Sequence, residues 1–238
     1  MVATVLHSGV VNALGADIVS GRIPVGTALT LEGIQERFDV SRTVAREGMR
    51  ILEAMHLVTS ERRHGIVVQP PESWHVFDRR VIRWRLDSEH RPAQLRSLTE
   101  LRIGIEPFAA HLAAARATED EKDALRQAAG EMRVFGEAGR LDRYLAADIA
   151  FHRTVLRASH NEMYVALIEP VIEAVSERPL HGHSHAYPVP AAMDLHEAVM
   201  LAIADGDGAA AEAAMLGILS DVRSGIGAAL HADDVTAG

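Results

Sequence analysis

The fold of the N-terminal region is decided by residues 30–55, TLEGIQERFDVSRTVAREGMRILEAM. Apolar residues recur at helical spacing from Leu31 to Phe38 and again after Ser41. Residues 39–40 interrupt the two patterns and predict a tight turn, and serine is among the residue types that best cap the start of a helix. The stretch therefore predicts two short helices joined by a turn, the helix-turn-helix arrangement.

Further elements are predicted on both sides of this pair. Residues 4–20 predict a helix with one apolar stripe at four-residue steps: Leu6, Val10, Leu14 and Ile18. Residues 58–60 and 66–68 are rich in β-branched side chains and flank a turn at residues 63–65. Helix, helix, turn, helix and hairpin together predict a winged helix-turn-helix domain over residues 1–70.

The second helix of the pair has one strongly basic face. Because successive helical residues turn by about 100°, three arginines form one stripe: Arg42, Arg46 and Arg50. The apolar residues fall on the opposite side: Val44, Ile51, Leu52 and Met55. Three arginines alone would describe an ordinary solvated face. The turn spacing, the hydroxyls of Ser41 and Thr43 at the helix tip, and the basic residues 62–64 of the hairpin favour a helix that reads DNA in the major groove.

Composition and charge narrow the class of protein. The net charge of −9 argues neither for nor against DNA contact, because residues 1–70 carry seven arginines and seven acidic residues and are neutral on their own. The absence of cysteine excludes disulfides and thiolate metal sites and suits a reducing compartment. No signal-peptide pattern and no membrane-length apolar run are present, so we expect a cytoplasmic protein that makes no membrane contact.

The rest of the chain predicts helices. Pro70 and Pro71 mark a linker over residues 71–77, an all-helical domain is expected over residues 78–230, and residues 231–238 predict a flexible tail. The predicted helices are 76–86, 93–116, 119–138, 141–159, 161–176, 190–205 and 208–230. We expect a mainly α protein, with an N-terminal winged helix-turn-helix and a C-terminal all-α antiparallel helical bundle.

Four polar residues fall where apolar ones would be expected. Asp148 and His152 lie one turn apart within one apolar stripe. His196 is at the centre of a second stripe, and Arg102 borders a third. Burying such groups without partners is costly, and Asp and His at this spacing can both reach one metal ion. Each alone could be a hydrogen-bonded core histidine or a plain ion pair, but together they favour a ligand pocket.

The N-terminal motifs resemble those of the GntR family of bacterial transcriptional regulators. The resemblance rests on residues 40–47, VSRTVARE, followed by Leu52-Glu53-Ala54 and Leu57-Val58. It implies that six residues contact operator DNA: Ser41, Arg42, Thr43 and Arg46 from the helix, and His64 and Gly65 from the wing. The family usually has a base-reading arginine where this chain has Glu32, which leaves the operator sequence open.

The C-terminal motifs resemble the FadR branch of that family, across about residues 78–230. They are residues 100–102 and 105–107 (ELR and IEP), 148–152 (DIAFH), 196–198 (HEA), 202–203 and 206–207. The resemblance implies that Asp148, His152 and His196 hold a divalent metal ion, zinc or similar, and that Arg102 binds an effector carboxylate.

One departure from the family and one further likeness refine this expectation. The branch usually supplies a third histidine where this chain has Ile218, so the implied metal set has three protein ligands and stays open to water and effector. Residues 73–74 and 81–84 resemble the sugar-acid (galactonate-type) repressors of the family, which implies an aldonate as effector.

The expected function is a DNA-binding regulator, by default a repressor that a small carboxylate releases from its operator. Because one short helix reads few base pairs, we expect a homodimer on an inverted repeat. Two alternatives stay open. A three-ligand site could serve a metal-dependent hydrolase or lyase acting on a small carboxylate, although no general base stands out on the same helix face. The helical domain could also only dimerise, with its polar cluster serving as structural hydrogen bonding.

Three histidines alternate in a segment that contains glycine, serine and proline: His181, His183 and His185. A solvated loop is the simpler interpretation. The alternative is a loop over the pocket that lends the missing metal ligand.

Overall fold

The computed structural model describes the backbone of residues 2–61, 65–177 and 190–236, and the side chains of these ranges except those of residues 2–7, 221 and 224–236. The chain forms two compact units, Met1–Gln94 and Leu95–Gly238. Each unit has its own core of buried apolar residues.

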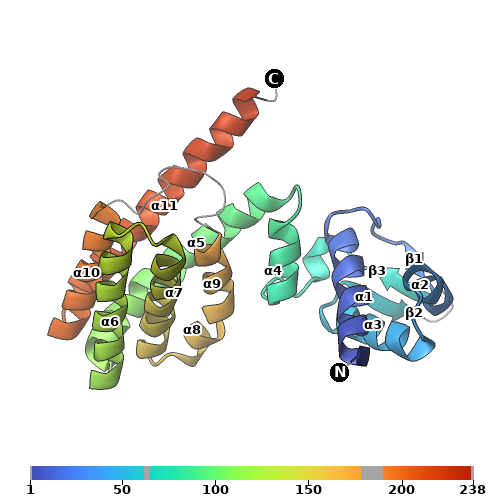
Figure 1. Ribbon diagram of the computed structural model, residues 1–238, viewed down its shortest axis with the longest axis horizontal. Helices are drawn as coiled ribbons and strands as arrows, with labels where there is room; N and C mark the ends of the chain where they lie inside the picture. Colours follow the sequence, from blue (N-terminus) through green and yellow to red (C-terminus); the bar gives the residue numbers. More distant parts are fainter. Residues whose placement is uncertain (1, 62–64, 178–189, 237–238) are drawn as a thin grey trace. The chain divides into compact units, whose positions relative to one another are not determined.

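The N-terminal unit contains the predicted winged helix-turn-helix (Figure 1). Its elements are α1 (Val2–Val19), β1 (Ala28–Leu29), α2 (Leu31–Phe38), α3 (Arg42–Ala54), β2 (Val58–Glu61), β3 (Gly65–Val68), the 3-10 turn η1 (Pro71–Ser73) and α4 (Arg79–Leu86). The sheet order is β1-β3-β2 and both pairings are antiparallel. Strand β1 was not predicted, because two residues are too short to carry an alternating pattern.

Local side-chain chemistry sets the ends of α2 and α3. The hydroxyl of Thr30 accepts a hydrogen bond from the backbone N–H of Gly33 at 3.0 Å and caps α2. Asp39 adopts a left-handed conformation with φ 50°, which aspartate tolerates better than most residues and which turns the chain sharply. The hydroxyl of Ser41 accepts from the N–H of Val44 at 3.3 Å, so the predicted turn and cap are confirmed.

Two glycines allow helices of the N-terminal unit to approach closely. A Cβ atom on Gly48 of α3 would lie 3.2 Å from Val10 of α1. A Cβ atom on Gly15 of α1 would lie 2.2 Å from the ring of Trp84, so no side chain fits there while α4 packs on α1. The structure therefore groups α4 with the N-terminal unit, whereas the sequence analysis assigned residues from 78 onward to the helical domain.

Every regular element in the described part of the C-terminal unit is a helix (Figure 1). The helices are α5 (Arg91–Arg116), which starts just before the unit boundary, α6 (Glu119–Glu137), α7 (Leu141–Ala158), α8 (Glu162–Ala166), α9 (Ile168–Ser176), α10 (Pro190–Asp205) and α11 (Gly208–Thr236). The predicted helix 161–176 is in fact two helices, because the chain leaves helical geometry at Leu167. Across the described residues, no helix is both long and apolar enough to cross a membrane.

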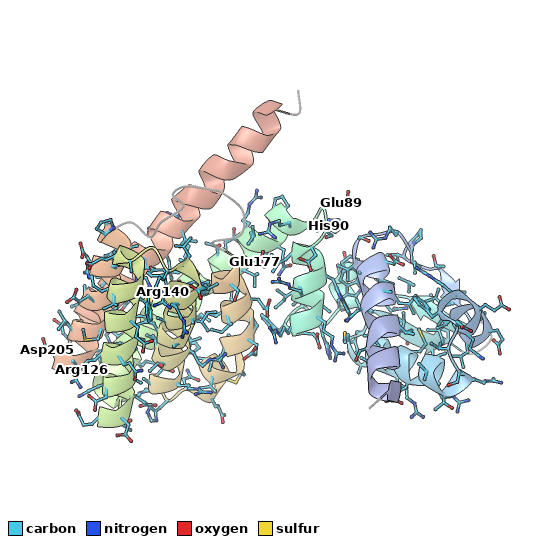
Figure 2. All side chains as sticks on the ribbon, viewed as in Figure 1. Glu89, His90, Arg126, Arg140, Glu177 and Asp205 are labelled. Carbon is cyan, nitrogen blue, oxygen red and sulfur yellow. The ribbon has the colours of Figure 1, made fainter. Side chains whose placement is uncertain are left out.

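The core of this unit lies between its helices. Helix α6 packs along α7, and α10 packs against both α6 and α11. Phe151, Val155 and Leu156 of α7 are fully buried between them. Many charged side chains of the unit point outward, as Figure 2 shows for Arg126 of α6 and Asp205 at the end of α10. The core thus places the inner face of α7 at the centre of the unit.

Candidate DNA interface and candidate metal centre

Helix α3 exposes the residues that the sequence analysis assigned to DNA contact. Ser41, Arg42, Thr43 and Arg46 are all exposed, as is Arg50. The buried face consists of Ala45, Gly48, Met49 and Leu52. Val44 and Ile51 are only half-buried, so the buried face is rotated from the predicted one, because α1 packs closely on Gly48. The arginine stripe still faces solvent.

The three arginines of the stripe differ in their neighbours. The guanidinium of Arg42 lies 3.8 Å from the carboxylate of Glu32 on α2, and both side chains are well exposed. Arg50 lies 3.9 Å from Glu47. Within the part of the chain that the structure describes, no ion pair forms at Arg46. Glu32 therefore places a negative charge beside Arg42, at the N-terminal tip of α3.

The wing is described in part. Gly65 starts β3 with φ 81°, a conformation that favours glycine, and a Cβ atom there would lie 3.3 Å from the carbonyl oxygen of Leu29. His64, with Arg62 and Arg63, lies outside the described residues.

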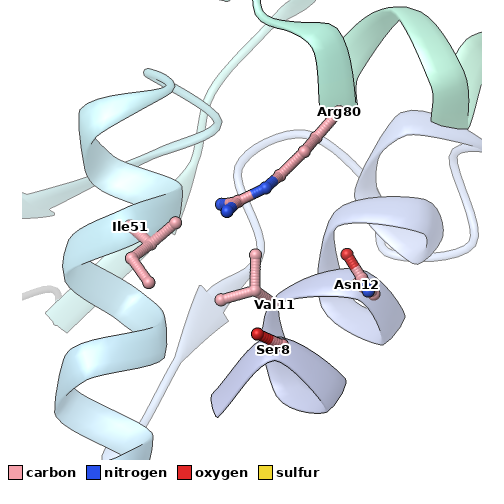
Figure 3. Close-up of a pocket in the computed structure, with 5 residues that line it drawn as sticks. All are labelled: Ser8, Val11, Asn12, Ile51 and Arg80. Carbon is pink, nitrogen blue, oxygen red and sulfur yellow. The ribbon is translucent and has the colours of Figure 1, made fainter. Parts of the chain in front are cut away.

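A separate pocket opens in the N-terminal unit between α1, α3 and α4 (Figure 3). Its volume is about 270 Å³, and it is lined by Ser8, Val11, Asn12, Ile51 and Arg80. Figure 3 shows the side chain of Arg80 reaching from α4 toward the space beside Ile51 and Val11. Its lining contains none of the residues assigned to DNA or effector contact.

In the helical unit, the four predicted polar residues meet in the core. Asp148 and His152 come from α7, His196 from α10 and Arg102 from α5. The exposed fraction of each is 2% or less. Arg102 was expected at the border of its apolar stripe, but it is at the centre of the buried face. The structure thus joins three helices through one polar cluster.

Three of these residues offer ligand atoms to a common point. One ligand atom each from Asp148, His152 and His196 lies within 4.8 Å of the others. Nε2 of His152 is 3.2 Å from Oδ1 of Asp148, and Nε2 of His196 is 3.3 Å from the same oxygen. A tetrahedral ion with ligand bonds of about 2.0–2.1 Å separates its ligands by about 3.3 Å. The two distances to Asp148 therefore fit a zinc-like ion.

Hydrogen bonds orient both imidazole rings. The Nδ1–H of His196 donates to the carbonyl oxygen of Ala192 at 2.6 Å. Nδ1 of His152 bonds to the carboxylate of Glu106 on α5. These partners leave both Nε2 atoms facing Asp148, as outer partners do at histidine metal sites. Nε2 of His196 is fully buried and forms no hydrogen bond, since its contact with Asp148 lacks hydrogen-bond geometry.

The protonation of the cluster follows from its charges. Burial raises the pKa of Glu106, but the guanidinium of Arg102 and the ring of His152 outweigh it and hold that pKa at about 2. Burial lowers the pKa of His152, but the Glu106 carboxylate outweighs it, so the net shift is upward. Burial lowers the pKa of His196, which keeps its ring neutral and able to act as a ligand.

Glu106 is the site residue that sequence reasoning missed. It is fully buried, accepts a hydrogen bond from Nε of Arg102 at 2.5 Å, and holds His152. The signal was its position one turn after Arg102, since two opposite charges at this spacing can share a buried face. Ile218 lies in the apolar core with 2% exposure, so its alkyl side chain offers no ligand. His181, His183 and His185 lie outside the described residues.

A winged helix-turn-helix followed by a helical unit with a buried polar cluster is the architecture of one-component transcription regulators, in which one polypeptide carries both domains. Two family descriptions match the sequence: bacterial regulatory proteins of the gntR family over residues 6–68, and the FCD domain over residues 97–221. The chain therefore belongs to the GntR family, and it is a transcriptional regulator of the GntR/FadR type.

Individual relatives agree with this assignment. The galactonate operon transcriptional repressor of Escherichia coli (strain K12) is 33% identical over 217 residues, which cover 89% of this chain and 92% of that protein. The transcriptional regulator LutR of Bacillus subtilis (strain 168) is 31% identical, covering 87% and 94%. The solved structure of Streptococcus agalactiae GntR has a TM-score of 0.51 at 22% identity, covering 92% of this chain and 99% of that one, and supports the fold alone.

Proposed function

We propose that this chain is a repressor whose operator binding is released by a small carboxylate, a sugar acid, bound in the helical unit. The observation that carries the proposal is the buried cluster of Arg102, Asp148, His152 and His196. Polar groups are costly to bury without partners, and the buried Nε2 of His196 forms no hydrogen bond within the described part of the chain. A guanidinium beside such histidines suits an anion. The name of the galactonate operon repressor, a relative at 33% identity, supports an aldonate.

The DNA contacts are assigned to the exposed face of α3 and to the wing. Arg42 and Arg46 contact phosphates and guanine edges, Ser41 and Thr43 add hydroxyl contacts at the helix tip, and His64 with Gly65 enters the minor groove. Two chains bind one inverted repeat as a homodimer, because the two-fold symmetry of the protein then matches that of the operator.

The effector site is assigned to the polar cluster. Asp148, His152 and His196 would hold a divalent ion, which when bound supplies a Lewis acid for a carboxylate oxygen. Glu106 and the carbonyl of Ala192 keep the two rings oriented, and Arg102 pairs with the carboxylate. With Ile218 in the core, the three protein ligands leave a coordination position for the effector.

A regulator is favoured over a metal-dependent hydrolase by the charges around the cluster. The buried carboxylate nearest to it, Glu106, is paired with Arg102 and His152, and its low pKa makes it a poor general base at neutral pH. The arginine stripe of α3 would also have no role in a hydrolase.

The test uses an operator selected from random DNA by the purified chain. Fluorescence anisotropy with this DNA is expected to show release by D-galactonate or another aldonate. D-galactose, which lacks the carboxylate, is the matched control and should have no effect. Proton NMR of the recovered sugar acid should show no turnover. Release by no carboxylate, or conversion of the sugar acid, would contradict the proposal.

A further inference from the structure

The guanidinium of Arg102 lies inside the ligand cluster, and it is shared between two partners. Its side chain is 1% exposed. Nε donates to Glu106, and Nη2 lies 3.2 Å from Nε2 of His152 and 3.5 Å from Nδ1 of the same ring. Because Nη2 is at similar distances from both ring nitrogens, it lies beside the His152 ring and not along the in-plane lone pair of Nε2.

The guanidinium and a metal ion bound to His152 would be close neighbours in a fully buried site. Nδ1 of His152 is engaged by Glu106, so Nε2 is the only ring nitrogen left to coordinate an ion. A metal bond to Nε2 would use its in-plane lone pair, which the guanidinium does not occupy, so a bound ion and the guanidinium would lie close together. A dication placed among these ligand atoms would repel the nearby guanidinium strongly, because the site is fully buried.

We propose that Arg102 is the resident counter-cation of this site, and that its positive charge opposes the binding of a divalent metal ion at Nε2 of His152. The inference rests on the proposed metal and effector site. It assigns Arg102 a second role, which is to hold the cluster together before the ion arrives.

This opposition has a consequence for the effector. Repulsion from the ion moves Nη2 away from the His152 ring, while Nε keeps its hydrogen bond to Glu106. The guanidinium turns about this hydrogen bond, and the two N–H groups of Nη2 become free. The site then holds more positive charge than before, and an anion offsets it. A carboxylate is thus recruited by the same movement that admits the ion.

The test is a Co²⁺ titration of the metal-free full chain, followed by its visible absorption, which also reports the coordination number. The decisive pair is Glu106→Gln against Glu106→Gln with Arg102→Met. Both variants keep an oxygen that accepts the His152 Nδ1–H, and they differ only in the guanidinium. The double variant should bind Co²⁺ about tenfold more tightly or better, because the opposing cation is gone. Arg126→Met, an exposed arginine of α6, should leave the affinity unchanged.

The outcomes separate this inference from the proposed function. If the chain binds Co²⁺ and the double variant binds equally or more weakly, the inferred opposition by Arg102 is wrong and the metal site stands. If neither variant nor the parent chain binds Co²⁺, the metal site and the opposition by Arg102 are both overturned. Circular dichroism of each variant checks that the helices persist.

Discussion

At the scale of single residues, Arg46 is the cation of the α3 stripe that is most available to DNA, because no ion pair forms at it among the described residues. We expect Arg46→Ala to weaken specific operator binding by about 1–3 kcal/mol, roughly tenfold to more than hundredfold, with an unchanged melting temperature. Anisotropy titration measures the loss, and Arg126→Ala on α6 is the matched control. Equal affinity of Arg46→Ala and the parent chain would remove Arg46 from the interface.

Glu32 gives a second test on the same surface. Its exposed carboxylate lies 3.8 Å from Arg42, one of the residues that we propose contact DNA. We expect Glu32→Gln to tighten operator binding a few-fold, since it removes a negative charge and frees Arg42, and an exposed pair contributes about 0.2–1 kcal/mol. Titrations at two salt concentrations measure this. Weaker binding would show instead that the Glu32 carboxylate accepts a hydrogen bond from a base edge.

The low pKa of Glu106 predicts a pH-dependent contribution to stability. Its pKa falls from an ordinary 4.5 to about 2 in the folded chain, so the stabilisation is complete above about pH 4.5 and is lost as the pH falls toward 2. The difference in unfolding free energy between the parent chain and Glu106→Gln should shrink across this window. Urea unfolding at several pH values measures the difference. A difference that stays constant from pH 6 to pH 3 would show that Glu106 is not ionised in the folded chain.

At the scale of elements, an ion cluster fixes α10, the helix that carries His196. Arg133 of α6 donates to Asp194 at 2.6 Å and to Glu197 at 2.9 Å, and these two residues flank His196. The carboxylates raise the pKa of Arg133, which keeps it charged. These two contacts, here called the Arg133 clamp, thus link α10 to α6 beside His196, a proposed metal ligand.

Loss of the Arg133 clamp should loosen α10 without unfolding the unit. In Arg133→Ala we expect faster amide hydrogen exchange across residues 193–199, and unchanged exchange in α7, whose core contacts remain. A metal affinity lowered a few-fold should accompany it, because His196 is then held less firmly. Arg126→Ala, whose partner Asp123 lies within α6, is the control. Unchanged exchange in α10 would mean that apolar packing alone fixes this helix.

The same scale shows what sequence patterns can and cannot predict. Asp148, His152 and His196 were found because each interrupts an apolar stripe, and their convergence is confirmed. Glu106 was missed because the inner face of α5 was assigned from its leucines, whereas that face buries Arg102 and Glu106.

Close packing at a glycine is also missed by apolar patterns. The buried side of α3 was misplaced because Gly48 has no side chain to count, although α1 packs directly on it. Apolar periodicity therefore predicts which segments are helices more reliably than it predicts the exact direction of the buried face.

At the scale of the whole molecule, effector response and DNA reading should be separable, because they reside in different compact units. His196→Ala removes one of three ligands and the ring that Ala192 orients, and it leaves the arginine stripe of α3 untouched. We therefore expect this variant to bind operator with the affinity of the parent chain and to ignore the sugar acid. Anisotropy with and without aldonate measures both properties.

Ion and effector should also strengthen each other in the parent chain. If the carboxylate binds the ion and Arg102 together, linkage requires that effector tighten metal binding by the same factor by which metal tightens effector binding. Isothermal titration of aldonate into metal-loaded and chelator-treated chain measures one factor, and metal titration with and without aldonate measures the other. Three protein ligands hold the ion less tightly than four, so the effector, as a further ligand, should have a large effect on metal affinity. Full effector affinity in metal-free chain would leave Asp148, His152 and His196 as a hydrogen-bonded pocket that needs no ion.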